Sequence, residues 1–369
     1  MTDQKCRIGY FCPSKSWGGL EMNQLRNAQW MKNRGHEVFL FVQEGSKIEA
    51  EAHEVNIPTI SVLPHKKYYD VFRAQALKRK IESFGISHLV VRDPKDMSVC
   101  ALAKTFSRSK FFLAYFMEMQ IGMAKRDILH TIRYKQYDLW SCPLPWLQKQ
   151  VHTLTKFPPE RTVVIPSGLD LDRYYDAPPP SIAKKKLKLA TDVEYIGLVG
   201  RFDPQKGQLL LLEAFNQIKN KIKHNLVLLG ESTHGEADEY FHQLRDFVRS
   251  NDLEDRVFFR SFRKDVEVFY SAIDVFVMAT ESETFGMVTI EALASGCRIV
   301  GSNKGGTVEI LNHGEFGKLF ISKNVNDLSN QIINAIEDPD FNPQEVIEES
   351  KKYSAAKISA SVEKVFGCN

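Results

Sequence analysis

Two carboxylates, Glu283 and Glu291, flank a short segment that bends at Phe285-Gly286 and continues into a run typical of a helix. The first N–H groups of a helix have no partner inside it, and the helix dipole adds partial positive charge at the same end. Such an end favours a phosphate group. The two carboxylates can accept hydrogen bonds from hydroxyls, such as those of a sugar and a ribose. The segment therefore suggests a nucleotide-sugar site.

A second segment carries two cations on a loop bent by proline and glycine. Arg201 and Lys206 follow an apolar run that ends at Gly200, and a helix-like run begins at Gln208. Two such side chains can converge on one dianion, and arginine can bind it through two hydrogen bonds. An arginine and a lysine at this spacing would ordinarily be surface charges in a turn. The strand, glycine and helix around them favour an anion site.

Both segments resemble motifs of one protein family. Residues 283–291 resemble the E-x7-E motif of retaining glycosyltransferases with the GT-B fold, of the family 4 type, and residues 200–207 resemble its G-R-l-x-x-x-K-G motif. The resemblance implies that Arg201 and Lys206 hold a donor diphosphate. It also implies that Glu283 orients the sugar hydroxyls and that Glu291 holds the ribose. The expected donor-binding residues are Gly18, Gly19, Arg201, Lys206, Gly230, Phe262, Arg263, Glu283, Phe285, Gly286, Met287, Val288 and Glu291.

The N-terminal half opens with a predicted strand–helix–strand unit in which Gly18-Gly19 follows the first strand. A Gly-Gly turn lets a backbone approach a ligand closely, although alone such a turn is more often structural. Its similarity to the family's GG-x-E segment, with Glu21 in place, favours a position in the donor or acceptor cleft.

The chain departs from the family pattern after the strand predicted at 110–116. The family commonly has a histidine there that contacts the donor sugar, whereas this chain has Met117-Glu118-Met119, and the nearest histidine is His130. Three alternatives stay open: Glu118 replaces the histidine, His130 reaches the site, or the activity is altered. Glu118 is included among the expected catalytic residues with Glu283, Arg201 and Lys206. Ligands bind at the carboxyl ends of parallel strands, so Arg92 and Asp93 are further candidates.

Residues 124–137 are predicted to form a helix in which basic and aromatic residues alternate. The simpler interpretation is a solvated helix with ordinary surface charge. The alternative is a site for an anionic acceptor or an anionic membrane surface.

The length and the element pattern predict two domains. The chain has 369 residues, 43% hydrophobic and 26% charged, and strands alternate with helices in both halves. This favours two doubly wound α/β domains with parallel sheets, and the resemblance implies that they face a cleft. We expect an acceptor domain at 1–170, a nucleotide-sugar domain at 171–345 and, at 346–369, a terminal helix that crosses back. Asp170 and Asp172 form a D-x-D pattern, but their segment matches the family's interdomain hinge rather than a metal site.

Composition excludes several other classes of protein. A net charge of +3 is too mild to indicate nucleic-acid binding. The six cysteines form no CxxC pair, so reduced thiols and no zinc site are expected. No secretory signal and no apolar run of roughly 18 residues is visible. We therefore expect a cytoplasmic protein, with possible peripheral contact at the inner face of a membrane.

The expected activity is the transfer of a hexosyl-type group from a UDP- or GDP-sugar to a hydroxyl acceptor, with retention of anomeric configuration. The acceptor class implied by the resemblance is a cell-envelope polysaccharide or glycolipid. Two cations and a helix dipole can replace a metal, so no metal or other cofactor is expected. Two rivals are a catalytically weak partner subunit that binds nucleotide sugar, and a nucleotide-sugar epimerase.

Overall fold

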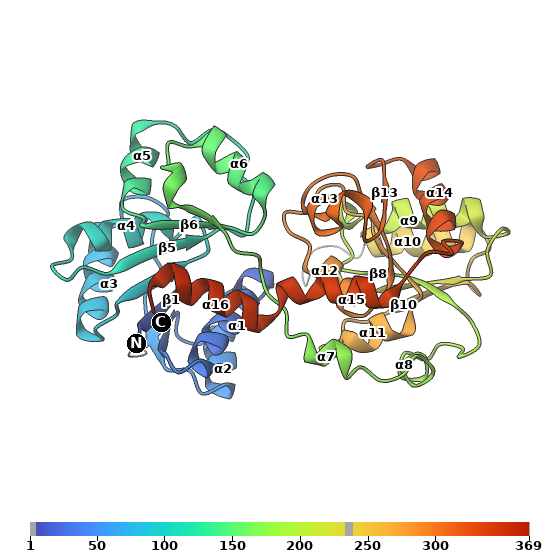
Figure 1. Ribbon diagram of the computed structural model, residues 1–369, viewed down its shortest axis with the longest axis horizontal. Coiled ribbons are helices and arrows are strands. Elements are labelled where there is room, and N and C mark those ends of the chain that lie inside the picture. Colours follow the sequence, from blue (N-terminus) through green and yellow to red (C-terminus); the bar gives the residue numbers. More distant parts are fainter. Residues whose placement is uncertain (1–4, 233–238, 369) are drawn as a thin grey trace. The chain divides into compact units, whose positions relative to one another are not determined.

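The computed structural model describes residues 5–232 and 239–368 (Figure 1). The chain divides into two compact units, one comprising Met1–Gly168 with Ala355–Asn369 and the other Leu169–Ser354. Each unit is built on a parallel sheet with flanking helices, which confirms the predicted pair of α/β domains. Among the described residues, no helix is long and apolar enough to span a membrane.

The sheet of the first unit has the strand order β3-β2-β1-β4-β5-β6-β7 within the described residues. Its strands are β1 (Arg7–Cys12), β2 (Glu37–Val42), β3 (Thr59–Ser61), β4 (His88–Val91), β5 (Phe112–Phe116), β6 (Leu139–Cys142) and β7 (Thr162–Val164). Its helices are α1 (Gly19–Asn33), α2 (Lys47–Glu54), α3 (Val71–Ser83), α4 (Met97–Phe106), α5 (Ile128–Lys135), α6 (Pro145–Leu154) and α16 (Ala355–Phe366). The order reverses between β1 and β4, so the loops that follow these two strands border a ligand-binding position.

The core of the first unit forms where continuous apolar strands meet helix faces. Leu40, Phe41 and Val42 of β2 are fully buried, as expected for a parallel strand covered on both faces. Ile358 and Val362 of α16 belong to the same buried cluster, so the last helix completes the core of the unit that contains the first strand. Figure 1 shows α16 beside α1.

The sheet of the second unit has the order β10-β9-β8-β11-β12-β13 within the described residues. Its strands are β8 (Tyr195–Val199), β9 (Asn225–Leu229), β10 (Val257–Arg260), β11 (Val275–Met278), β12 (Arg298–Ser302) and β13 (Lys318–Phe320). Its helices are α7 (Asp172–Tyr175), α8 (Pro180–Lys186), α9 (Gln208–Ile218), α10 (Glu239–Ser250), α11 (Glu267–Ala272), α12 (Met287–Ala294), α13 (Gly306–Ile310), α14 (Val325–Ile336) and α15 (Pro343–Ser350). Here the order reverses between β8 and β11, the strands that precede the two predicted phosphate-binding segments.

Two predicted element boundaries are wrong. The basic helix expected at 124–137 begins at Ile128, because the Asp127 side chain caps it by accepting the His130 N–H at 3.1 Å. The single terminal helix expected at 346–369 is instead part of two helices, α15 and α16, separated by a short 3₁₀ turn. The helix expected from 237 is described from Glu239, and residues 237–238 lie outside the described part.

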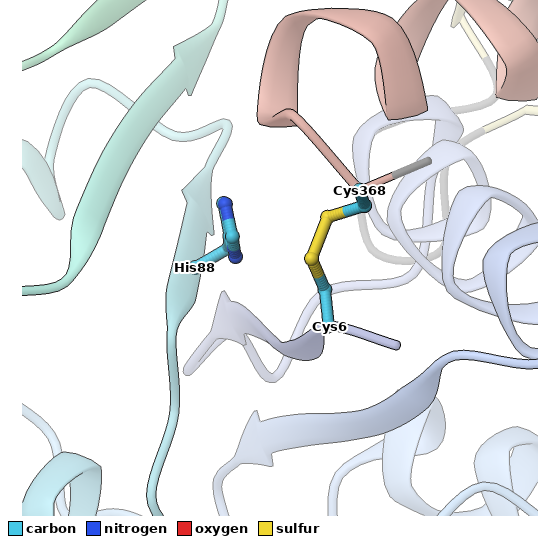
Figure 2. A group of neighbouring side chains, drawn as sticks. All are labelled: Cys6, His88 and Cys368. Carbon is cyan, nitrogen blue, oxygen red and sulfur yellow. A yellow bond between two sulfur atoms is a disulfide. The ribbon is translucent and has the colours of Figure 1, made fainter. Parts of the chain in front are cut away.

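The expectation of six reduced thiols is also wrong, because Cys6 and Cys368 form a disulfide (Figure 2). The bond joins the residue before β1 to the segment after α16, across 362 positions of sequence. Cys12, Cys100 and Cys142 are free and buried in the same unit. Cysteine pairing cannot be deduced from spacing alone.

His88 lies beside this disulfide (Figure 2). One ligand atom from each of Cys6, His88 and Cys368 lies within 4.8 Å of the others, a spacing that could hold a metal ion. The two sulfurs are bonded to each other, however, and both ring nitrogens of His88 are engaged. Nε2 lies 3.0 Å from the Phe366 carbonyl oxygen and Nδ1 lies 2.9 Å from Ser87 Oγ. The disulfide therefore links the end of α16 covalently to the residue before β1.

Candidate active site

The loops after β8 and β11 bring one of the two predicted cations, Lys206, to the first predicted carboxylate, Glu283. Lys206 Nζ lies 3.0 Å from Glu283 Oε2, although the two residues are 77 positions apart. Their side chains are 33% and 22% exposed, so the pair is reachable from solvent. The contact lies at the carboxyl edge of the sheet, where the strand order reverses, as expected for ligand sites in such sheets.

Arg201 stands at the start of the same loop. Its Nη2 lies 3.0 Å from Asp203 Oδ2, and its side chain is 53% exposed. The Gln208 side chain donates to the Arg201 carbonyl at 2.7 Å, which fixes the loop against the start of α9. The backbone is thus held while most of the guanidinium faces solvent, where it can meet an anion.

Two glycines let the loops of this edge approach one another. A Cβ on Gly230, after β9, would lie 2.0 Å from the Gly200 carbonyl oxygen, so no larger residue fits. Gly305, after β12, has φ +68°, and its Cβ would lie 2.3 Å from the Glu283 carbonyl oxygen. The next N–H, of Gly306, donates to that oxygen at 2.8 Å. The backbone of Glu283 is therefore fixed by the glycine turn that follows β12.

Helix α12 begins beside this carboxylate. Gly286 is its N-cap with φ +100°, and no side chain caps the helix start. Phe285 is buried, with its ring centroid 6.1 Å from that of Tyr353 in an edge-to-face contact. The Thr289 hydroxyl in the first turn is buried and has no hydrogen-bond partner among the described residues. The helix start thus offers backbone N–H groups and a polar side chain to a ligand.

The second predicted carboxylate, Glu291, lies further along α12 and contacts Tyr270 of α11. The Tyr270 hydroxyl lies 2.9 Å from Glu291 Oε2 and 3.1 Å from the Val288 carbonyl oxygen. Burial, reinforced by the charge of Glu291, raises the pKa of Tyr270 well above its usual value. Tyr270 therefore stays protonated and orients the carboxylate. Tyr270 was not among the predicted site residues, because it is 21 positions from Glu291 and no local pattern relates the two.

For the remaining predicted residues of this unit, no side-chain hydrogen bond or ion pair with Lys206 or Glu283 is found among the described residues. Phe262 and Arg263 follow β10, the edge strand, which is two positions from β8 in the sheet. Phe262 is 61% exposed, and Arg263 forms two hydrogen bonds to Asp265, at 3.0 and 2.7 Å. Met287 and Val288 are half-buried in the first turn of α12.

In the first unit, the predicted Gly18-Gly19 turn leads into α1. The Glu21 carboxylate accepts a hydrogen bond from the Gly18 N–H at 3.0 Å, and Glu21 is only 7% exposed. This is the capping arrangement that fixes the start of a helix. In this structure Glu21 therefore positions the turn.

Glu118 follows β5 and forms an ion pair with Arg92, which follows β4. Asn23 of α1 also donates to Glu118, at 3.3 Å, so three segments around the switch between β1 and β4 meet here. The two charged side chains are only 12% and 5% exposed. Burial raises the pKa of Glu118, and the charge of Arg92 opposes the rise. His130, the other candidate, lies in α5 and bonds instead to Asp127, the N-cap of that helix, with 2.5 Å between Nδ1 and Oδ2.

A buried His65–Asp96 pair is a polar feature that sequence analysis did not find. His65 Nε2 lies 3.0 Å from Asp96 Oδ1, and both side chains are less than a tenth exposed. Burial raises the pKa of Asp96 to about 6. The pair joins the loop after β3 to the start of α4, and the 31 positions between its members hide it from local patterns.

Comparison with known proteins assigns both units. Residues 181–353 match the family model "Glycosyl transferases group 1", and residues 17–173 match the model "Glycosyltransferase Family 4". The chain belongs to this glycosyltransferase family. Its two parallel-sheet domains have the GT-B fold: the HepE protein of Anabaena, solved with UDP and glucose, superposes with a TM-score of 0.80 at 21% identity, covering 98% of this chain and 99% of that one.

Among relatives of the glycosyltransferase, N-acetyl-alpha-D-glucosaminyl L-malate synthase of Bacillus anthracis is 23% identical over 98% of this chain and 97% of its own. The lipopolysaccharide 1,2-N-acetylglucosaminetransferase of Salmonella typhimurium is 28% identical over 44% of each chain. These relatives place the chain among enzymes that transfer sugars. The two relatives differ in acceptor.

Proposed function

We propose that this glycosyltransferase moves a sugar from a nucleotide diphosphate sugar, of the UDP or GDP type, to a hydroxyl acceptor with retention of anomeric configuration. The observation that carries the proposal is the contact of Lys206 with Glu283 beside the uncapped start of α12, with Arg201 exposed on the same loop as Lys206. A diphosphate suits the cations and the helix start. The hydroxyls of a sugar and a ribose suit Glu283 and Glu291.

The chemistry follows from where charge develops. As the bond between sugar and phosphate breaks, negative charge grows on the diphosphate, and Arg201, Lys206 and the α12 N–H groups stabilise it. Such preorganised stabilisation contributes roughly 2.7–4 kcal/mol per donor removed. Two cations and a helix dipole take the part that a metal plays elsewhere, so the proposed reaction is metal-independent.

The partner of Lys206 changes from Glu283 to phosphate when the donor binds. An arriving phosphate takes over Lys206, because a dianion attracts an ammonium more strongly than a single carboxylate does. Glu283 is then free to accept hydrogen bonds from the sugar hydroxyls and to favour the oxocarbenium-like state. No protein nucleophile is required if the departing phosphate accepts the proton of the acceptor hydroxyl on the same face of the sugar.

For the acceptor, we propose a cell-envelope glycan or glycolipid that receives the sugar at the cytoplasmic side of the membrane. We also propose that the enzyme contacts an anionic membrane peripherally. Support comes from the lipopolysaccharide transferase among the relatives. It also comes from the basic and apolar surface of the first unit around α5, where Ile128, Leu129 and Ile132 are each more than half exposed.

Thermal stability measured against a panel of UDP-, GDP- and ADP-sugars tests the donor site. A ligand at about 100 times its dissociation constant should add about 2.7 kcal/mol to the stability of the protein. The shift should appear with one nucleotide and be lost in Arg201→Ala and Glu291→Ala. Arg249→Ala, which removes an exposed arginine of α10, is the matched control and should keep it.

Three outcomes separate the alternatives. A selective shift followed by turnover that survives EDTA, with a product of retained configuration by NMR, supports the whole proposal. A selective shift without turnover on any acceptor identifies the catalytically weak partner subunit. The absence of a shift with every nucleotide sugar, in folded protein, refutes the donor site.

A further inference from the structure

A groove in the first unit lies between α4 and α5. Its cavity volume is about 330 Å³, within the range of small-ligand pockets. Each helix presents one face to it, with residues at spacing i, i+3, i+4 and i+7. These are Ser98, Ala101, Leu102 and Thr105 of α4, and Leu129, Ile132 and Arg133 of α5 together with Gln136, its C-cap. Tyr68 and Tyr69, before α3, complete the wall.

The surface of this groove is overwhelmingly apolar. Leu129 and Ile132 are each 56% exposed, and Tyr69 is 60% exposed. Scattered exposed apolar residues need no explanation, but several that line one cavity mark a place where an apolar group binds. The walls are aliphatic side chains and tyrosine rings, which suit a hydrocarbon chain.

One part of the groove is cationic. Arg133 is held by Ser98 Oγ, 3.1 Å from its Nη1, and by the Tyr134 hydroxyl, 3.1 Å from its Nη2. Its carbon Cζ also lies 5.7 Å from the centroid of the Tyr68 ring. The guanidinium is therefore fixed at the groove wall, and its Nε is buried without a hydrogen-bond partner among the described residues.

His130 adds a second buried nitrogen of this kind. Its Nδ1 bonds to Asp127, whereas its Nε2 is buried and has no partner in the described part of the chain. Buried polar groups in native proteins are normally hydrogen-bonded. The Asp127 carboxylate can only accept, so Nδ1 carries the proton and Nε2 of the neutral ring accepts a hydrogen bond, whereas Nε of Arg133 donates one. Together the two nitrogens suit a ligand group that both accepts and donates, such as a protonated phosphate.

The orientation of the groove relates this polar group to the sheet. Ser98 lies in the first turn of α4, and α4 starts from the carboxyl edge of the sheet after β4. Arg133 is tied to Ser98, so the cationic part faces that edge, where Arg92 and Glu118 also lie. A chain lying toward Thr105 would extend away from the edge.

We propose that this groove binds one hydrocarbon chain of an anionic amphiphile, with its phosphate-type head group at Arg133 and His130. The inference rests on the proposed function, since it names the acceptor class of the same enzyme: a lipid-linked acceptor that carries a phosphate next to its chain. The chain is held between α4 and α5, and the head group is held at the carboxyl edge of the sheet.

Binding of decyl phosphate to the full-length protein, below its aggregation concentration, tests the inference by calorimetry. Decanol and inorganic phosphate are the comparison ligands. Decyl phosphate should bind at least tenfold more tightly than either, because only it fills both parts of the groove. Equal binding of inorganic phosphate would show an adventitious anion site and overturn the proposal, as would no binding of decyl phosphate.

Helix α5 provides matched variants. Leu129→Glu and Ile132→Glu place a charge in the groove at residues already exposed, so folding should be kept, and each should weaken decyl phosphate at least tenfold. Ile128→Glu adds the same charge next to Leu129, at a residue that is 71% exposed and does not line the groove, and it should bind as the parent does. Equal weakening by all three would indicate a diffuse surface effect and contradict the proposal.

Arg133→Gln separates the head group from the chain. It should weaken decyl phosphate but leave decanol unchanged. Binding to vesicles of anionic lipid tests the alternative that this surface contacts a membrane. If Ile128→Glu and Leu129→Glu reduce vesicle binding equally and decyl phosphate does not bind, the surface is a membrane contact and the proposed lipid groove is refuted. Failure of decyl phosphate with an intact nucleotide-sugar shift refutes this inference alone, whereas loss of the nucleotide-sugar shift in the parent protein refutes the proposed function.

Discussion

Lys206 Nζ and Glu283 Oε2 lie 3.0 Å apart, in a contact between the loops that follow β8 and β11. Each side chain thus neutralises the other in the absence of a donor. Because the pair is partly exposed, its own contribution to stability is small, about 1 kcal/mol at most. In the proposed reaction the contact matters because the diphosphate of the donor would have to displace Glu283 from Lys206.

Lys206→Ala should therefore lower turnover by roughly 100- to 1,000-fold, the cost of one lost donor to a developing negative charge. Thermal stability without ligand should change little. Steady-state kinetics and a melting curve measure the two effects. Lys318→Ala, which breaks a 2.6 Å ion pair with Asp338 at the start of β13, is the control and should keep full turnover. Near-normal turnover of Lys206→Ala would exclude the proposed role.

Gly305→Ala should disturb the site through the backbone of Glu283. Gly305 has φ +68°, and an added Cβ would lie 2.3 Å from the Glu283 carbonyl oxygen. Strain of this kind costs about 1–3 kcal/mol, and the displaced Glu283 should weaken donor binding. Gly45→Ala separates backbone strain from contact, because Gly45 has φ +71° but open space around its Cβ position.

Both glycine variants should therefore melt earlier, but only Gly305→Ala should lose the stabilisation by nucleotide sugar. If Gly305→Ala binds the donor as the parent does, the glycine turn after β12 does not control Glu283.

Elements and contacts differ in how far sequence predicts them. The helix predicted to follow Phe285-Gly286 is confirmed at Met287–Ala294, because Gly286 and the apolar run after it are local signals. The meeting of Lys206 and Glu283 could be anticipated as well, since both follow strands of one parallel sheet. The Tyr270–Glu291 contact could not, because nothing in the local sequence relates a hydroxyl on one helix to a carboxylate on another. The Cys6–Cys368 pairing depends on where α16 packs, which only the tertiary structure determines.

Glu118→Gln tests whether Glu118 takes part in catalysis or only compensates Arg92. The change leaves the Arg92 guanidinium buried without its counter-ion, which should cost about 3–5 kcal/mol of folding stability. The double variant Glu118→Leu with Arg92→Met removes both charges and should recover most of that loss. Turnover that returns with stability in the double variant would show a purely structural role. Turnover that stays low in the refolded double variant supports a role at the site.

The disulfide between Cys6 and Cys368 should stabilise the first unit. Cys6→Ser should lower its stability by about 2–5 kcal/mol, and dithiothreitol should have the same effect on the parent protein. Dithiothreitol should not lower the stability of Cys6→Ser any further. Cys297→Ser changes a buried free cysteine of the second unit and should keep the response to dithiothreitol. A parent protein that melts identically with and without reductant would contradict the prediction.

Acid should loosen α16 through Glu363. The hydrogen bond from Arg34, helped by His36 at 2.9 Å, holds the pKa of Glu363 below its usual value. A depressed pKa in the folded state contributes stability above the pKa of an unfolded-chain glutamate, about 4.3. This contribution is lost as the pH falls through the lower folded value. Glu363→Gln should therefore cost about 1 kcal/mol at pH 7 and progressively less below about pH 4.

The comparison for this last prediction is Glu37→Gln, which breaks the ion pair of Glu37 with Arg7 in the same unit. That pair is about half exposed on both sides, whereas the Glu363 side chain is only 13% exposed. Screening by water weakens the exposed pair, so Glu37→Gln should change stability less at pH 7. Denaturant melts of the three proteins between pH 3 and pH 8 provide the measurement. A stability difference for Glu363→Gln that does not shrink in acid would show that the Arg34–Glu363 contact is not what holds α16 to its unit.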